Sequence, residues 1–332
     1  MEPVPARAHI AEKPVRRSPW WRNVITAGVT LGLVAWVARQ LNLSGFLHAI
    51  SQINHAAYLA FMFVFVLVLL VADTAAISHV YMRYVCPVSP TEVLILRGAS
   101  YLPAVVNYHI GQAWLTWLAS SVYGANLARV AGATLLNYAT MFGSLALLAA
   151  LAYPLGGYRI PWLATTLLVL GGALLVYLTV VVSKPRWVTR IPGASVLMEA
   201  GVSGHLLALA FRLPHMVILF LGMWLPLGFF GISIPLGDAL AYVPILMLVG
   251  ALPITPQGVG TRDVVALKLL GGYAPAGAAA DAVAAATLCW AVSLTLIQVV
   301  LAPLFLALAR RLLRNAEVLR ATSTPLAATQ VK

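Results

Sequence analysis

The sequence predicts an all-α, polytopic helical membrane protein with about six full spans and two re-entrant hairpins. Three observations support this prediction: the composition, six long apolar runs, and two apolar regions broken by proline and glycine. Of 332 residues, 61% are hydrophobic and 9% are charged, and the mean hydropathy is +0.92. An average soluble domain carries about a quarter charged residues, and disordered chains are poor in apolar residues. Soluble and disordered classes are therefore excluded.

The positive charge is concentrated at the two ends of the chain. Residues 1–22 carry a net +3 and residues 310–332 a net +4 of the formal +12. Basic residues just outside the first and last apolar runs mark the cytoplasmic side of a membrane. A nucleic-acid surface would instead need a basic, water-exposed face with stacking aromatics. We expect two basic cytoplasmic tails, a location in the cytoplasmic (plasma or inner) membrane, and no nucleic-acid partner.

The segment 23–309 is predicted to form a single transmembrane domain. A span needs about 20 apolar residues. The runs that meet this length are about 23–40, 56–80, 127–152, 161–183, 203–231 and 278–309.

Residues 93–123 and 237–272 are apolar but interrupted, and they resemble each other. Gly111 follows Pro103 by eight positions, and Gly260 follows Pro253 by seven. A short apolar segment comes after the glycine in both regions. If both regions are re-entrant, they enter the membrane from opposite faces. The two halves of the chain that contain them, about 56–152 and 203–309, then form an inverted repeat. Two ordinary two-span hairpins would also satisfy the charge rule, so that alternative stays open. Broken segments at corresponding places in two halves indicate a transporter site.

The strongest local motif lies in the second hairpin. It contains Pro253, Pro256, Gly258, Gly260, Thr261, Arg262 and Asp263. The prolines end one helix, the glycines permit a turn, and a half-helix starts near Thr261. The exposed backbone amides at the start of this half-helix, together with Arg262, could bind a phosphate. The alternative is a turn in which Thr261 caps the helix and Asp263 offsets its dipole.

The polar residues of the first hairpin form the second candidate group. They are Asn107, His109, Gly111 and Gln112, which follow the helix breaker Pro103. Their apolar setting predicts either a water-lined cavity or satisfied hydrogen bonds between helices. A proton-relay role for His109 is a further alternative.

Two buried charges are candidates for coupling. Asp73 lies deep in the second span, so it should pair with a cation or be protonated, and Arg129, Arg212 and Arg262 are the candidate partners. Arg212 stands beside Pro214, where the fifth span could kink. Arg97 is predicted to lie on the cytoplasmic side.

The run Pro-x-x-Pro-x-Gly-x-Gly-x-Arg-acidic, followed by a half-helix and a long terminal span, resembles the lysylphosphatidylglycerol synthase transmembrane family. These flippase-like proteins occur alone or fused to an aminoacyl-lipid synthase domain. The resemblance covers about residues 20–315. Asn107 and Gly111 match the family's first loop, whereas Tyr108-His109 replaces its Pro-Gly pair and Asp263 replaces a common Glu. The resemblance implies that this chain is a stand-alone member of the family, without the synthase domain.

Together these patterns predict a lipid flippase or transporter for a polar- or phosphate-headed lipid. An intramembrane transferase, or a non-transporting partner of a lipid or hopanoid pathway, stays open. The sequence holds no nucleotide-binding loop, metal-ligand spacing or nucleophile motif, so we expect no enzyme, cofactor or metal. Membrane lipids are the expected partners; a homo-oligomer or a lipid-synthesis partner is left open.

Overall fold

The protein is an all-α, polytopic membrane protein. The computed structural model describes residues 43–251 and 260–329. Within them, five helices are long and apolar enough to cross a membrane. They are α3 (His55–Tyr84), α7 (Leu127–Ala152), α8 (Leu163–Ser183), α10 (Ala194–Trp224) extended by η2 (Leu225–Phe230), and α13 (Ala279–Thr329). They match five of the six predicted spans. The predicted span 23–40, the tail 1–22, and Pro253, Pro256 and Gly258 lie outside the described residues.

Both interrupted regions consist of short helices. The first contains α4 (Pro90–Ala99), α5 (Tyr101–Val106) and α6 (Tyr108–Tyr123), and the second contains α11 (Leu236–Ala251) and α12 (Thr261–Leu270). The longest of them has 16 residues, about 24 Å at 1.5 Å per residue. A bilayer core is about 30 Å thick, so none of these helices spans it alone. The remaining short elements are α2 (Leu43–Ser51), η1 (Gly157–Arg159), α9 (Arg186–Thr189) and η4 (Gly271–Tyr273).

Local chemistry explains the breaks in the first hairpin. Pro103 has no N–H to bond to the carbonyl of Ala99, where α4 ends. Asn107 adopts an extended conformation (φ −163°) and caps α6, because its side chain accepts the His109 N–H at 2.8 Å. Gly124 ends α6 in the left-handed conformation (φ 67°), which favours glycine.

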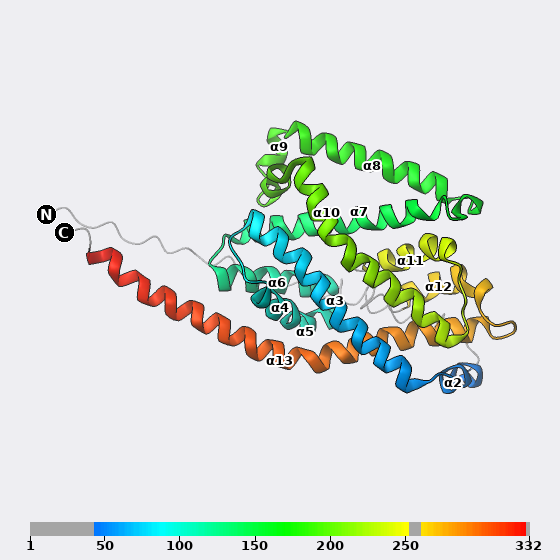
Figure 1. Ribbon diagram of the computed structural model, residues 1–332. Helices are drawn as coiled ribbons and strands as arrows, with labels where there is room; N and C mark the ends of the chain where they lie inside the picture. The colour runs from blue at the N-terminus through cyan, green and yellow to red at the C-terminus, as the bar shows by residue number, and fades with distance from the viewer. Residues whose placement is uncertain (1–42, 252–259, 330–332) are drawn as a thin grey trace, which may run out of the picture.

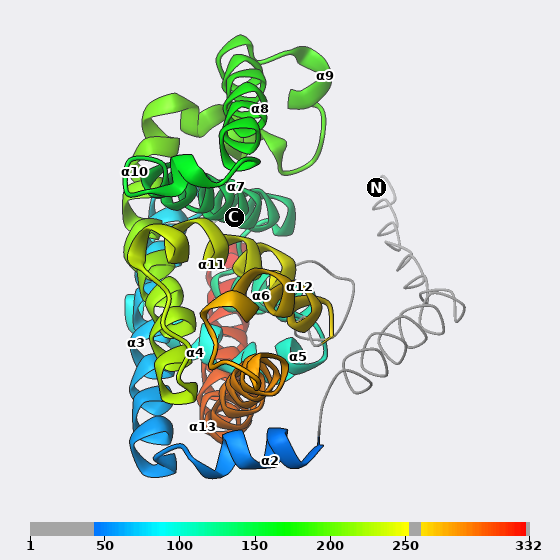
Figure 2. The same ribbon diagram turned by 90° about the vertical axis from the view of Figure 1, so that its right-hand side faces the viewer.

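The two hairpins enter the helix bundle from opposite ends, as predicted. In Figure 1, α4–α6 lie toward the left end, where α3 finishes and α7 begins, and α11–α12 lie toward the right end, where α13 begins. The start of α6 and the end of α11 meet, since His109 lies 2.8 Å from the Ala251 carbonyl. Figure 2 shows α8 and α9 at the edge of the molecule, away from both hairpins. The broken segments therefore form the centre of the fold and α8 its periphery.

The crossing of α7 and α10 depends on a glycine. A Cβ added at Gly132 would overlap the carbonyl oxygen of Gly193, just before α10 begins, and would crowd Val196. The absence of a side chain lets the two backbones approach closely, as small residues do between membrane helices.

The break in α10 lies at a glycine and not at its proline. Pro214 lies inside the helix, and the non-helical residue is Gly201, with φ 57° and ψ −173°. A glycine takes this conformation readily, because it has no Cβ to collide with the carbonyl. The helix breaks at Gly201, nearer its start, whereas Pro214, where a kink was considered possible, keeps helical φ and ψ.

The last helix is much longer than a single span. Its candidate membrane segment, Ala279–Val318, has 40 residues, which is about 60 Å of helix. Residues 310–329 continue α13 as a helix, and in Figure 1 its end projects past the other helices at the left. The basic C-terminal segment is thus an extension of the final helix.

Candidate functional site

A cavity of about 140 Å³ lies between the short helices of the two hairpins and the long helices. Helices α3, α4, α5, α6, α7, α10, α11, α12 and α13 all contribute to its wall. Much of the wall is apolar, with a group of flexible methionines, Met141, Met216, Met223 and Met247. The cavity thus lies at the junction of the two interrupted regions.

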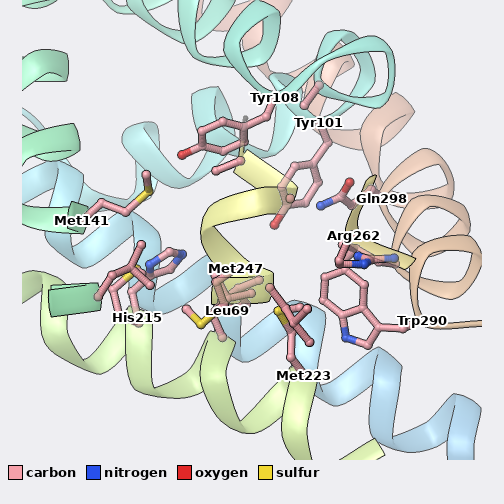
Figure 3. Close-up of a pocket in the computed structure, with 18 of the residues that line it drawn as sticks. Leu69, Tyr101, Tyr108, Met141, His215, Met223, Met247, Arg262, Trp290 and Gln298 are labelled. Atoms are coloured by element: carbon pink, nitrogen blue, oxygen red, sulfur yellow. The ribbon is translucent and has the colours of Figure 1, made fainter. Parts of the chain in front are cut away.

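A few polar side chains enter this apolar wall. They are Arg97, Tyr101, Tyr108, His215, Arg262 and Gln298. In Figure 3, His215 approaches from the α10 side, whereas Arg262 and Gln298 lie across the space beside Trp290. The polar groups thus come from both hairpins and from the helices between them. An apolar pocket with few convergent polar groups is typical of a ligand site.

Asp73 is the centre of a buried ion cluster beside the cavity. Its Oδ2 accepts from Arg97 Nε at 2.5 Å, and its Oδ1 accepts from an Arg212 guanidinium nitrogen, also at 2.5 Å. Arg97 also donates to the Ser100 hydroxyl at 2.8 Å, and Arg212 donates to the Asn137 side-chain oxygen at 2.7 Å. The cluster therefore joins α3, α4, α7 and α10. Burial of such charges is tolerated because each has hydrogen-bonded partners.

A second, much smaller cavity adjoins the cluster. Its volume of about 10 Å³ is close to that needed for a single water molecule. Asp73, Gln112, Asn137 and Arg212 supply polar groups to its wall, and Tyr108 lines both cavities. The polar centre of the protein thus extends from the ion cluster toward the first hairpin.

Arg262 occupies the opposite side of the larger cavity and is only 2% exposed. It donates to the Thr287 carbonyl at 2.9 Å, and its guanidinium carbon lies 4.8 Å from the centre of the Trp290 ring, a cation–π contact. Its closest approach to the Asp263 carboxylate is 3.7 Å, too long for a hydrogen bond. The Arg262 Nε has no hydrogen-bond partner within the described part of the chain. Arg262 thus places a positive charge at the cavity wall.

Asp263 has a local structural task. Its Oδ2 accepts the N–H of Gly260 at 2.9 Å, at the start of α12, where an unpaired amide would otherwise remain. Gly260 itself has a positive φ of 85° and is the residue that caps α12, whereas Thr261 is its first helical residue. The capping alternative therefore describes Asp263 correctly but names the wrong cap residue.

His109 joins the two hairpins. One ring nitrogen lies 2.9 Å from the Tyr138 hydroxyl on α7, and the other lies 2.8 Å from the Ala251 carbonyl at the end of α11. The ring also stacks on Tyr138. Both nitrogens are thus engaged in bonds between elements, which assigns His109 a structural contact.

The structure brings together only some of the predicted site residues. Arg262 lines the larger cavity, and Asp73, Arg212 and Gln112 line the smaller one. The wall residues of the two cavities do not include Asn107, His109, Gly111, Gly260, Thr261 or Asp263. Gly111 serves packing, since a Cβ there would press on the α5 backbone at Ala104.

Arg97 and His215 are the functional candidates that the sequence did not indicate. Arg97, predicted to lie on the cytoplasmic side, is only 8% exposed and bonds to Asp73, so it belongs to the buried ion cluster. Of the three candidate partners of Asp73, only Arg212 pairs with it. Arg129 instead forms an exposed pair with Glu199 at 3.0 Å, and Arg262 faces Asp263.

Neither the protein-family models nor the curated proteins compared with this chain include a match, so the resemblance to the lysylphosphatidylglycerol synthase transmembrane family stays a prediction.

Proposed function

We propose that the protein moves a membrane lipid with a polar or phosphate-bearing headgroup between the two leaflets. The observation that carries this proposal is the central cavity between two broken hairpins that enter from opposite ends of the bundle. Broken helices are tolerated at membrane depth only where protein or a water-filled cavity covers their unpaired backbone groups. The same cover is what a polar headgroup needs in order to cross hydrocarbon.

The size and chemistry of the cavity fit a headgroup. Its volume of about 140 Å³ is below the range of about 300–1,000 Å³ for drug-sized ligands, so the acyl chains would stay in the bilayer. Arg97 and Arg262 offer guanidinium groups from opposite hairpins, and guanidinium binds phosphate through strong charge-assisted hydrogen bonds. Apolar methionines supply an adaptable wall for the adjoining glycerol region.

The carboxylates near the cavity favour binding over transferase chemistry. Asp73 is held by Arg97 and Arg212, and Asp263 accepts a backbone amide. A general base must reach the proton it removes; both oxygens of Asp73 are occupied by guanidinium groups, and Asp263 lines neither cavity. A labelled lipid-linked donor incubated with the purified protein tests the alternative, because a transferase would form a new product and a transporter would not.

The charge distribution supports cytoplasmic termini. Arg83 lies in the last turn of α3 and Lys184 follows α8, and in Figure 1 the ends of these two helices and the C-terminal part of α13, which contains Arg310 and Arg311, lie toward the same side. Concentration of Lys and Arg on one side is the pattern of the cytoplasmic face. This orientation would open the first hairpin toward the cytoplasm.

Arg262→Gln is expected to slow lipid exchange at least about tenfold, since a hydrogen bond to a charged group contributes about 1.5–3 kcal/mol and 1.4 kcal/mol is a factor of ten. The measurement uses purified protein in liposomes that contain a panel of headgroup-labelled lipids, with the outer leaflet quenched chemically. Arg262→Lys should retain part of the rate, because it keeps the positive charge without the bidentate geometry.

Arg129→Gln is the matched control, because it removes an arginine from an exposed pair far from the cavity lining. It should exchange lipid at the unmodified rate, and thermal unfolding should show that each variant is folded. Equal exchange with and without protein across the whole panel would refute transport. Equal loss in Arg129→Gln and Arg262→Gln would remove Arg262 from the binding site.

A further inference from the structure

His215 stands at the junction of the ion cluster and the larger cavity. It is 8% exposed, and its Nε2 lies 3.9 Å from the Asp73 Oδ1. Its Nδ1 is buried and has no hydrogen-bond partner within the described residues. Figure 3 shows the ring at the cavity wall, opposite Arg262. An unpaired buried ring nitrogen is costly, and it can accept a proton without breaking an existing bond.

Charged and titratable groups face this part of the protein from several helices. Asp73 on α3, Arg97 on α4 and Arg212 on α10 form the adjoining cluster. Tyr101 on α5, Tyr108 on α6 and Arg262 on α12 line the same cavity as His215. The cluster contains one carboxylate for two guanidinium groups, so it carries a surplus of one positive charge. A bound anion would neutralise that surplus.

We infer that the cavity binds an anionic headgroup together with a proton, and that His215 holds the proton. The inference rests on the proposed function, because it concerns the same cavity. A proton on His215 and an anion in the cavity have opposite charges and share a site of low dielectric, where charges interact strongly. Each therefore strengthens the binding of the other by the same factor.

The coupling supplies a driving force for transport. A proton from water binds a ring nitrogen of His215 as the anion enters, and it returns to water when the anion leaves. No bond other than that N–H forms or breaks. If both enter from one side and leave on the other, a transmembrane proton gradient drives anionic lipid in the direction of proton flow. Asp73 is less suited to this task, since two guanidinium groups occupy its oxygens.

Proton uptake on ligand binding tests the inference directly. The probe is dihexanoyl phosphatidylglycerol, whose single phosphodiester charge does not change between about pH 5 and about pH 8, the range in which histidine titrates. Calorimetry in buffers of different ionisation enthalpy reports the protons bound per anion. We expect uptake of up to one proton and an affinity that rises by up to about tenfold per pH unit on acidification. Dihexanoylglycerol, which lacks the phosphate, should show no uptake.

His215→Gln keeps a polar side chain that cannot take up a proton. It should bind the probe with a pH-independent affinity and without proton uptake. The matched control is His205→Gln on the same helix, because His205 is equally buried but bonds to Tyr177 and the Gly201 carbonyl, away from the cavities. His205→Gln should behave as the unmodified protein. Uptake that persists in His215→Gln, or is absent from the unmodified protein while the probe binds, overturns the inference.

A transport assay in liposomes distinguishes failure of this inference from failure of the proposed function. In liposomes with a pH gradient, the unmodified protein should accumulate labelled anionic lipid in one leaflet, whereas His215→Gln should only equilibrate it. Proton-coupled binding without exchange would retain the coupled site and reject transport. Exchange that ignores both pH and the gradient would retain transport and reject the coupling. Absence of both binding and exchange rejects both.

Discussion

Asp73→Asn is expected to destabilise the folded protein by about 3–5 kcal/mol, the usual cost of removing one partner from a buried ion pair. The substitution leaves Arg97 and Arg212 facing each other without their shared carboxylate, in a part of the protein that water does not reach freely. The loss would appear as a lower thermal unfolding midpoint in detergent, or as a smaller folded fraction after purification.

Two further variants test whether the loss of stability comes from the buried ion cluster. Glu199→Gln removes a carboxylate from the exposed pair with Arg129, and surface pairs contribute about 0–1 kcal/mol, so its midpoint should hardly move. The triple variant Asp73→Asn, Arg97→Gln, Arg212→Gln removes the whole cluster and should recover most of the lost stability, because an uncharged replacement leaves no orphan charge. Equal midpoints for Asp73→Asn and Glu199→Gln would contradict the prediction.

Gly132→Ala is expected to cost about 1–3 kcal/mol, the usual penalty for forcing extra volume into a packed interface. The new methyl group would overlap the carbonyl oxygen of Gly193, which belongs to the backbone and cannot rotate away. Helices α7 and α10 would have to separate. The unfolding midpoint in detergent measures the effect.

Gly143 offers a control on the same helix. A Cβ at Gly143 would lie 3.4 Å from the Leu209 Cδ1, an ordinary contact with a flexible side chain. Alanine also favours the helix over glycine by about 0.8–1.0 kcal/mol. Gly143→Ala should therefore be neutral or slightly stabilising. If Gly132→Ala matches it, the close crossing of α7 and α10 does not contribute to stability.

The long helices could be predicted from the sequence, because the backbone polar groups of a membrane-spanning segment must be hydrogen-bonded within it. A long apolar run such as 127–152 must form a helix to satisfy its backbone, and α7 has these bounds. Pro103 was identified as a helix breaker, whereas the cap that Asn107 forms at the start of α6 was not predicted. The break in α10 at Gly201 was not predicted, because a glycine in a membrane helix is common and gives no signal of its own.

The candidate site was only partly readable, since its contacts join distant parts of the chain. Arg262 could be identified because a charge beside a broken apolar segment is costly. Arg97 meets the same criterion, yet it was read as a topology charge, because hydropathy does not reveal a carboxylate 24 positions away. His215 lies inside the predicted span 203–231, where an ionisable residue is itself a signal, but its distance to Asp73 and the cavity beside it are visible only in the structure.

The bonds of His109 to Tyr138 and to the Ala251 carbonyl brace the two hairpins against each other. A hydrogen bond tolerates only a few tenths of an ångström of stretch before it weakens. The first turn of α6 therefore cannot shift far unless the end of α11 moves with it. The two hairpins are thus linked where α6 begins and α11 ends, so that movement of one is either shared by the other or begins with the rupture of the His109–Ala251 hydrogen bond.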